Sequence, residues 1–334
     1  MIIVSKAGFV QNWWRSVDQP IIIAALSLIA ISIILVTTAG PAVSNRIGLE
    51  ESYFIKKHLI FICVSLSFAF IISLFDKKRL TRFALLGLFA NIILLIIVQF
   101  LGYEVKGAKR WLNIAGFSLQ PSELVKPCFI VVTAWILSLK NKDESFPSFY
   151  VALALYLLVT ALIIIQPDIG MLVTISSIWA IQLFLAGLPL IWFIVIGFSS
   201  LTLLLCAYYL LPHVAQRINS FLDPSKHENY QVNKSLLAFK NGGLYGRGPG
   251  EGVVKQVLPD SHTDFIFAVA AESIINIGVN LNLLPTKGMT LPFISSGGSS
   301  ILAVSICFGM LIGLTKRKTN LTKFRLNKIE ATFE

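Results

Sequence analysis

The sequence predicts an all-α polytopic membrane protein, built as a bundle of about 8–10 transmembrane helices in a single domain over residues 1–334. The first observation is composition: 55% of the residues are hydrophobic and only 13% are charged. The second is a mean hydropathy of +0.77, which no soluble domain of this length reaches. The third is a series of apolar runs, each long enough to cross ~30 Å of hydrocarbon.

The apolar runs follow one another from near the N-terminus to near the C-terminus. They lie at about 21–40, 58–75, 83–101, 121–139, 150–166, 170–186, 189–211 and 293–315. The first run is a retained span, because the stretch before it is long and no small-residue cleavage site follows. A further run at 265–284 is ambiguous, because it carries Glu272 and three asparagines.

The basic residues are unevenly distributed among the connections, with a formal net charge of +11. Half of the 28 Lys and Arg lie in the N-terminus, the 76–82 loop, the 140–148 loop and the tail 316–334. If the spans alternate, these segments share one side, so the positive-inside rule predicts that both termini are cytoplasmic. Lys56 and Lys57, in an opposite loop, run against the trend. Because the cations flank spans, topology explains them better than nucleic-acid binding.

Two loops on the predicted outer side, 102–120 and 212–264, hold most of the polar motifs. Loops of this length are usually functional or disordered. The second loop contains an amphipathic stretch at 230–240, which we expect to lie along the membrane interface. Its glycine-rich part at 242–252 lacks the GxxxxGK[ST] pattern, so tight turns explain it better than a nucleotide-binding loop.

Cysteine and histidine spacing gives no indication of a metal site. The cysteines lie within apolar runs without CxxC spacing, and we expect all of them to be small buried core residues: Cys63, Cys128, Cys206 and Cys307. The histidines are scattered without ligand spacing. No cofactor is predicted, and the need for a divalent cation is left open.

Several short motifs occur in a fixed order along the chain. They are Lys109-Arg110-Trp111-Leu112, Gln120-Pro121-Ser122-Glu123-Leu124, Gln166-Pro167-Asp168-Ile169-Gly170, Gly246-Arg247-Gly248, His262-Thr263-Asp264-Phe265-Ile266 and Pro292-Phe293-Ile294-Ser295-Ser296-Gly297-Gly298. Together they resemble the SEDS family (shape, elongation, division and sporulation; FtsW/RodA-like), whose members are membrane glycosyltransferases that polymerise peptidoglycan. The stretch Pro285-Thr286-Lys287-Gly288-Met289-Thr290-Leu291-Pro292 resembles the division branch of that family more than the elongation branch.

The resemblance implies that the protein polymerises lipid II into glycan strands during septal cell-wall synthesis. The acceptor hydroxyl must lose a proton, and Asp264 fits as the general base at the outer membrane face. The diphosphate leaving group needs fixed cations, for which Arg110, Lys109 and Lys287 are the candidates. Arg247 and His262 are secondary candidates for the same role. A single strong acid favours direct inverting displacement.

Each of these residues also has a structural interpretation. Asp264 suits the N-cap of the helix predicted from Phe265, and Asp168 the N-cap of the helix entered at Ile169. Arg110 beside Trp111 could anchor the chain at the headgroups, and Lys287 could reach them from within the bilayer. Glu123 and Lys126, spaced i,i+3, are predicted to form a structural ion pair, with Glu123 as a secondary substrate-site candidate.

The chain departs from the family pattern near Glu272. In the family, one span follows His-Thr-Asp-Phe and a second span ends at Leu-Pro-Thr-Lys-Gly; here Ala271-Glu272 runs directly into Ser273. An outgoing leg, a loop and a returning leg, about 45 residues, are missing. If the protein is active, we expect 265–284 to dip into the membrane and return, with Gly278 near the turn.

The predicted partners follow from the resemblance. They are lipid II and the growing glycan strand, a class B penicillin-binding protein transpeptidase, other divisome proteins and membrane lipid. The predicted location is the bacterial inner membrane at the division septum. Two alternatives remain open: a lipid II flippase, and a catalytically inactive divisome scaffold that has lost the missing segment.

Overall fold

The computed structural model describes residues 8–105, 108–114, 117–210, 230–242, 252–254, 292–294 and 297–316, together with Ala215, Asn219 and Arg247. The long helices are α2 (Gln19–Arg46), α3 (Tyr53–Ser73), α4 (Lys77–Leu101), α5 (Pro121–Leu139), α6 (Ser148–Ile165), α7 (Ile169–Leu185), α8 (Leu190–Leu210) and α12 (Gly298–Thr315). Each of these helices coincides with one of the predicted apolar runs, with ends shifted by a few residues. The run 265–284 lies outside the described residues.

Among the described residues, six helices are long and apolar enough to cross a membrane: α2, α3, α4, α5, α6 and α12. α7 and α8 are apolar helices of 17 and 21 residues without a charged side chain, which is within the range for a span. Two shorter helices are α1 (Phe9–Ser16) and α10 (Tyr230–Gly242). The second covers the amphipathic stretch at 230–240.

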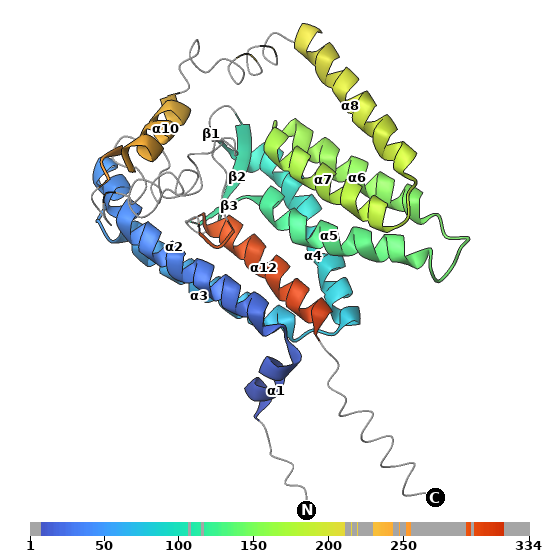
Figure 1. Ribbon diagram of the computed structural model, residues 1–334, viewed down its shortest axis with the longest axis horizontal. Coiled ribbons are helices and arrows are strands. Elements are labelled where there is room, and N and C mark those ends of the chain that lie inside the picture. The colour runs from blue at the N-terminus through green and yellow to red at the C-terminus, as the bar shows by residue number, and fades with distance from the viewer. Residues whose placement is uncertain are drawn as a thin grey trace, which may run out of the picture.

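The helices run between two distinct ends of the bundle (Figure 1). α1, the end of α12 and the α3–α4 connection lie at one end, which we call the basic end because Lys77, Lys78 and Arg82 start α4 there. The connection between α4 and α5 lies at the opposite end, together with α10 (Figure 1). Because α2 to α8 alternate in direction, α8 finishes at this second end and α12 starts there.

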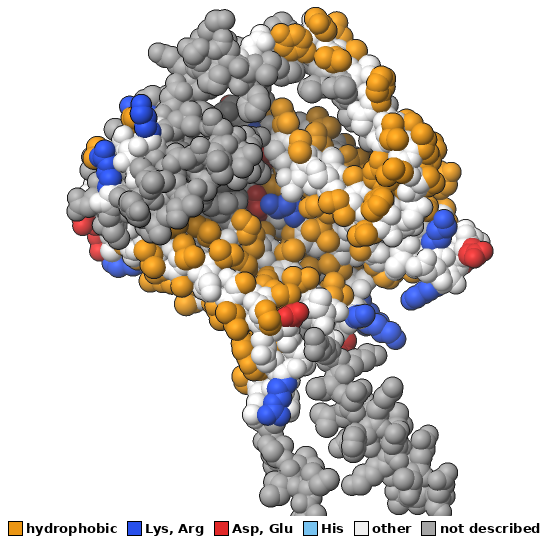
Figure 2. All heavy atoms as spheres, in the orientation of Figure 1, with side chains coloured by type: hydrophobic (Ala, Val, Ile, Leu, Met, Phe, Trp, Pro, Cys, Tyr) orange, Lys and Arg blue, Asp and Glu red, His pale blue; other side chains and the backbone are white. Residues whose placement is uncertain are grey.

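The core forms where α12 packs between α3 and α5. Phe129 and Val125 of α5 are fully buried against α4 and α6. Gly309 lets α12 approach α3 closely, since a Cβ there would lie 2.7 Å from the backbone oxygen of Ala69. Small residues at such crossings are how membrane helices gain packing contacts. Figure 2 shows the outer surface of the bundle as mostly apolar, as a lipid-facing surface must be.

The expectation that all four cysteines are buried is wrong for three of them. Cys128 is buried, whereas Cys63, Cys206 and Cys307 are exposed on helix surfaces. In a membrane protein, an apolar side chain is as favourably placed against lipid as against the core. Hydrophobicity therefore predicted membrane residence correctly but not which face of the helix each cysteine occupies.

The connection 102–120 contains a small sheet that the sequence did not reveal. β1 (Tyr103–Val105), β2 (Ala108–Ile114) and β3 (Phe117–Leu119) form an antiparallel meander in the order β1-β2-β3. Glu104 of β1 lies opposite Lys109 of β2, an opposite-charge cross-strand pair. β2 also packs against α4 and α5, and β3 against α12. We call this end of the molecule the sheet end.

Candidate active site

The alternation of side chains along β2 separates its two basic residues. Successive residues of a strand point to opposite faces. Leu112 is buried and Arg110 is half-buried, so this face of β2 packs against the bundle. Lys109 on the other face is exposed. The two cations named from the sequence therefore have different environments, one within the protein and one toward water.

Arg110 clamps the turn between α6 and α7. Its Nε donates to the carbonyl oxygen of Gln166 at 3.1 Å, and a terminal nitrogen donates to that of Pro167 at 2.6 Å. The other terminal nitrogen lies 3.7 Å from a carboxylate oxygen of Asp168. The two carbonyl groups belong to consecutive residues of the turn, so the guanidinium fixes the backbone between α6 and α7. These contacts favour positioning of the turn over anchoring at lipid headgroups.

The same turn is fixed from two further directions. Asp168 caps α7 by accepting a hydrogen bond from the backbone N–H of Met171 at 3.1 Å, which confirms the predicted cap. Gln166 is 1% exposed, and its amide nitrogen lies 3.4 Å from the carbonyl oxygen of Leu95 in α4. The Gln-Pro-Asp motif thus links α4, α7 and the sheet.

The predicted ion pair at the start of α5 is confirmed. Lys126 Nζ lies 2.7 Å from Glu123 Oε2, and the side chains are 24% and 9% exposed. Both residues lie in the first two turns of a helix that begins directly after β3, and so at the sheet end. A carboxylate this deeply buried needs its cation, because an unpaired charge costs several kcal/mol to bury (roughly 3–5).

A substitution series tests whether this pair is structural. We expect Lys126→Met to reduce stability by about 3 kcal/mol, because it leaves the buried Glu123 carboxylate unpaired. Thermal unfolding in detergent should show a melting temperature lower by about 5 °C. Glu123→Gln should cost less, since Lys126 is more exposed and can reach water. The double variant should recover most of the loss; a Lys126→Met protein as stable as the parent would contradict the structural role.

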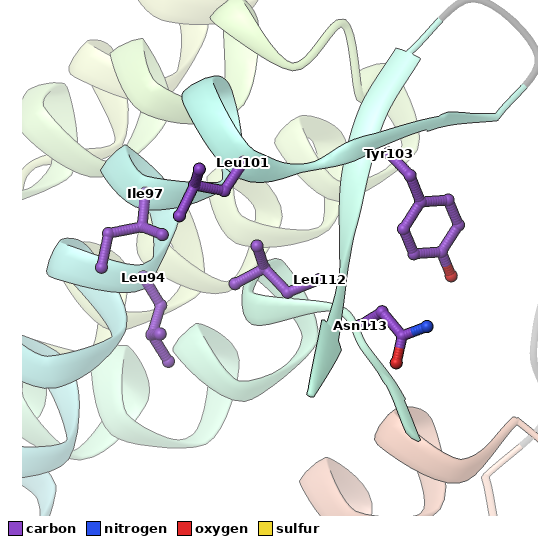
Figure 3. A pocket seen from close by; sticks show the side chains of 6 residues that line it. All are labelled: Leu94, Ile97, Leu101, Tyr103, Leu112 and Asn113. Atoms are coloured by element: carbon purple, nitrogen blue, oxygen red, sulfur yellow. The ribbon is translucent and has the colours of Figure 1, made fainter. Parts of the chain in front are cut away.

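An apolar cavity of about 510 Å³ lies at the same end, between α4 and the sheet. Leu94, Ile97, Leu101 and Leu112 lie on one side of the strands, with Tyr103 and Asn113 on the other (Figure 3). No lining residue is charged. The cavity is suited to a hydrocarbon chain, whereas a diphosphate would need the cations that lie elsewhere on β2 and α5.

A buried polar contact connects the turn before α12 to α2 and α3. The Ser32 hydroxyl donates to the carbonyl oxygen of Ile294 at 3.0 Å and lies 2.6 Å from His58 Nε2. His58 is only 2% exposed. The turn includes Phe293, which has a positive φ of 62°. In the sequence it lies between Lys287 and the start of α12. Scattered histidine spacing gave no sign of this contact, which joins residues far apart in sequence.

The remaining predicted site residues divide into two groups. Arg247 is exposed, and its Nε donates to the carbonyl oxygen of Asn241 at 3.1 Å, so it binds the C-terminal end of α10. Asp264, His262 and Lys287 lie outside the described residues. The structure therefore brings Arg110 together with Asp168, and Glu123 together with Lys126. The catalytic and substrate-binding roles assigned to the site residues from the sequence stay predictions.

The bundle of long apolar helices, whose charged residues lie near the helix ends in the part of the chain that the structure describes, defines a multi-pass membrane protein. A family model described as "Cell cycle protein", FTSW_RODA_SPOVE, matches residues 18–274 and 271–320. The chain belongs to this family.

Relatives and solved structures agree with that assignment. The chain is 34% identical to a probable peptidoglycan glycosyltransferase FtsW of Caulobacter vibrioides, covering 92% of this chain and 91% of the relative. It is 32% identical to the corresponding protein of Coxiella burnetii, covering 91% and 98%. A solved peptidoglycan synthase complex contains a chain with a TM-score of 0.73, 21% identity and coverage of 90% and 98%. The Thermus thermophilus rod shape determining protein RodA gives a TM-score of 0.56, 20% identity and coverage of 90% and 97%.

The comparisons also locate the shortening of the chain. The two matched stretches of the family model meet at residues 271–274. The alignment with the Caulobacter relative runs over 354 residues, more than the 334 residues of this chain. Some residues of the relative therefore have no counterpart here. The break coincides with the position, near Glu272, where the sequence predicts the missing segment.

Proposed function

We propose that this protein polymerises lipid II into glycan strands of peptidoglycan, with Asp264 as the general base. The observation that carries the proposal is the placement of charge in a chain whose relatives are named peptidoglycan glycosyltransferases. In the described membrane-spanning helices, Asp, Glu, Lys and Arg occur only near helix ends, and the half-buried pairs Arg110–Asp168 and Glu123–Lys126 both lie at the sheet end. This arrangement favours chemistry at one face over transport through the bundle.

The reaction divides the charged groups into separate roles. The acceptor hydroxyl oxygen bonds to the anomeric carbon of the donor sugar, its proton passes to the Asp264 carboxylate, and the bond to the diphosphate breaks. Lys287 and the exposed Lys109 stabilise the departing diphosphate. Arg110 acts by holding the α6–α7 turn, since at least two of its N–H groups are bound to Gln166 and Pro167. Glu123, His262 and Arg247 complete the set of substrate-site candidates.

The setting of the reaction follows from the same assignment. The basic end faces the cytoplasm with both termini, and the sheet end faces the outer side, where lipid-linked sugars are polymerised. The partner is a class B penicillin-binding protein transpeptidase, in line with the similarity to a chain of a peptidoglycan synthase complex. As a member of the division branch of the family, the protein is expected to act at the septum with other divisome proteins.

The shortening near Glu272 favours one further candidate, a catalytically inactive divisome scaffold. The test is glycan polymerisation by the purified protein with its transpeptidase partner, supplied with lipid II in detergent. Strand formation above the level of an Asp264→Ala control supports the enzyme. A protein that binds its partner but forms no strands is the scaffold.

A second measurement distinguishes the enzyme from a flippase. We expect Lys287→Ala to slow polymerisation about 10²-fold in detergent, where no flipping is needed. Arg110→Ala should also slow it, and Arg110→Lys should not restore the rate, because a single ammonium nitrogen does not reproduce the planar guanidinium whose three nitrogens face Gln166, Pro167 and Asp168. Lys240→Ala, an exposed cation on α10, serves as the matched control. Defects confined to sealed vesicles would favour transport.

A further inference from the structure

A second cavity, of about 590 Å³, lies at the basic end, far from the sheet. It is formed by the first turns of α4, the second half of α5 and the last turn of α12. This volume is within the range of small-ligand sites. We call it the basic groove, because Lys77, Lys78, Arg82 and Lys142 line it. Figure 2 shows basic side chains gathered around this end of the molecule.

The lining of the basic groove changes character along its length. Leu85 is about two helical turns, ~12 Å, further along α4 than Lys77, and Ile130 is about as far from Ser138 on α5. The cations therefore stand at the mouth, while Leu85, Ile130, Val131 and Ala134 form an apolar floor toward the membrane interior. The groove is therefore complementary to an anionic phospholipid, because its cations match a negatively charged headgroup and its apolar floor matches an acyl chain.

The charge at the mouth is not neutralised by the described part of the protein. No acidic residue lines the groove. Asp76 lies 4.0 Å from Arg79, which is not a lining residue, and Asp143 accepts hydrogen bonds from Ser145. Among the described residues, none forms an ion pair with the four lining cations. Trp135 at the rim is 37% exposed, as expected for an indole at headgroup level.

We propose that the basic groove binds an anionic phospholipid of the adjacent leaflet. The phosphate is held by Lys78, Arg82 and Lys142, and one acyl chain lies over Leu85 and Ala134. Basic pockets between membrane helices on the cytoplasmic side bind anionic headgroups in this way. Such a lipid would join α4, α5 and α12, the helices that also position the sheet end through β2 and β3.

Native mass spectrometry of the full-length protein in detergent tests the assignment, with phosphatidylglycerol and phosphatidylcholine as probes. The groove variant carries Lys78→Gln, Arg82→Gln and Lys142→Gln. The control variant carries Arg15→Gln, Arg79→Gln and Lys140→Gln, which remove the same charge outside the groove. Each groove cation should contribute about fivefold in affinity, so phosphatidylglycerol binding should weaken about 10²-fold in the groove variant and about twofold in the control.

A third variant separates a lipid from a free phosphate. Ala134 is exposed to the groove, so Ala134→Phe fills the floor without disturbing the core. We expect it to reduce retention of phosphatidylglycerol while leaving binding of glycerol phosphate unchanged. Three results would overturn the proposal: equal loss in groove and control variants, equal binding of both lipids by the parent, or an undiminished lipid affinity in Ala134→Phe. Unchanged melting temperatures establish that the variants are folded.

Discussion

Asp264→Asn is expected to abolish glycan polymerisation while leaving the protein folded. Asparagine is nearly isosteric with aspartate and caps a helix equally well, so the substitution removes only the ability to accept a proton. Loss of a general base typically lowers the rate by ~10²–10⁴-fold. The measurement is strand length and yield from lipid II, with the transpeptidase partner present.

Two controls test whether the Asp264→Asn defect lies in the chemical step. Asp168→Asn changes an acid that caps α7 and lies near Arg110, and it should keep most of the activity because the cap is retained. Lipid II binding to the Asp264→Asn protein should match the parent, which separates a chemical defect from a binding defect. Polymerisation at the parental rate by Asp264→Asn would remove Asp264 from the mechanism.

A second prediction concerns the path that the chain takes through the membrane between α8 and α12. α8 finishes and α12 begins at the sheet end, so we expect the intervening stretch to cross the membrane an even number of times or not at all. The run 265–284 has 20 residues, enough for one crossing of ~30 Å but not for two. We therefore expect it to dip in and return, with legs of about 10 residues each. Such a backbone is stable only where protein encloses it.

Cysteine labelling in intact spheroplasts decides this path. In a background without the four native cysteines, a cysteine at Lys287 should react with an impermeant thiol reagent, and one at Asn320 should be protected. Cysteines at Glu104, exposed on β1, and at Lys142, at the basic end, provide the positive and negative controls. Protection at 287 with labelling at 320 means a single crossing. Lys287 would then lie on the face opposite Asp264, and the proposed site could not assemble.

Local sequence was sufficient where the physical cause is itself local. The spans were predicted because a helix that must cross hydrocarbon needs a continuous apolar run, and the Asp168 cap and the Glu123–Lys126 pair span only three residues each. The sheet in 102–120 was missed because its strands are short. Its clearest signal was the alternation Lys109, Arg110, Trp111, Leu112, in which the buried Leu112 shares a face with Arg110.

The sequence by itself determined the membrane class, the family, the positions of the long apolar helices and the place of the shortening. All of these depend on composition or on ordered motifs. Only the tertiary structure decided what Arg110 does, because its partners in the α6–α7 turn lie 56 and 57 residues away. It likewise placed Ser32 against Ile294, 262 residues apart. Hydropathy shows that a helix is in the membrane, whereas the partners of its polar groups depend on which helices pack together.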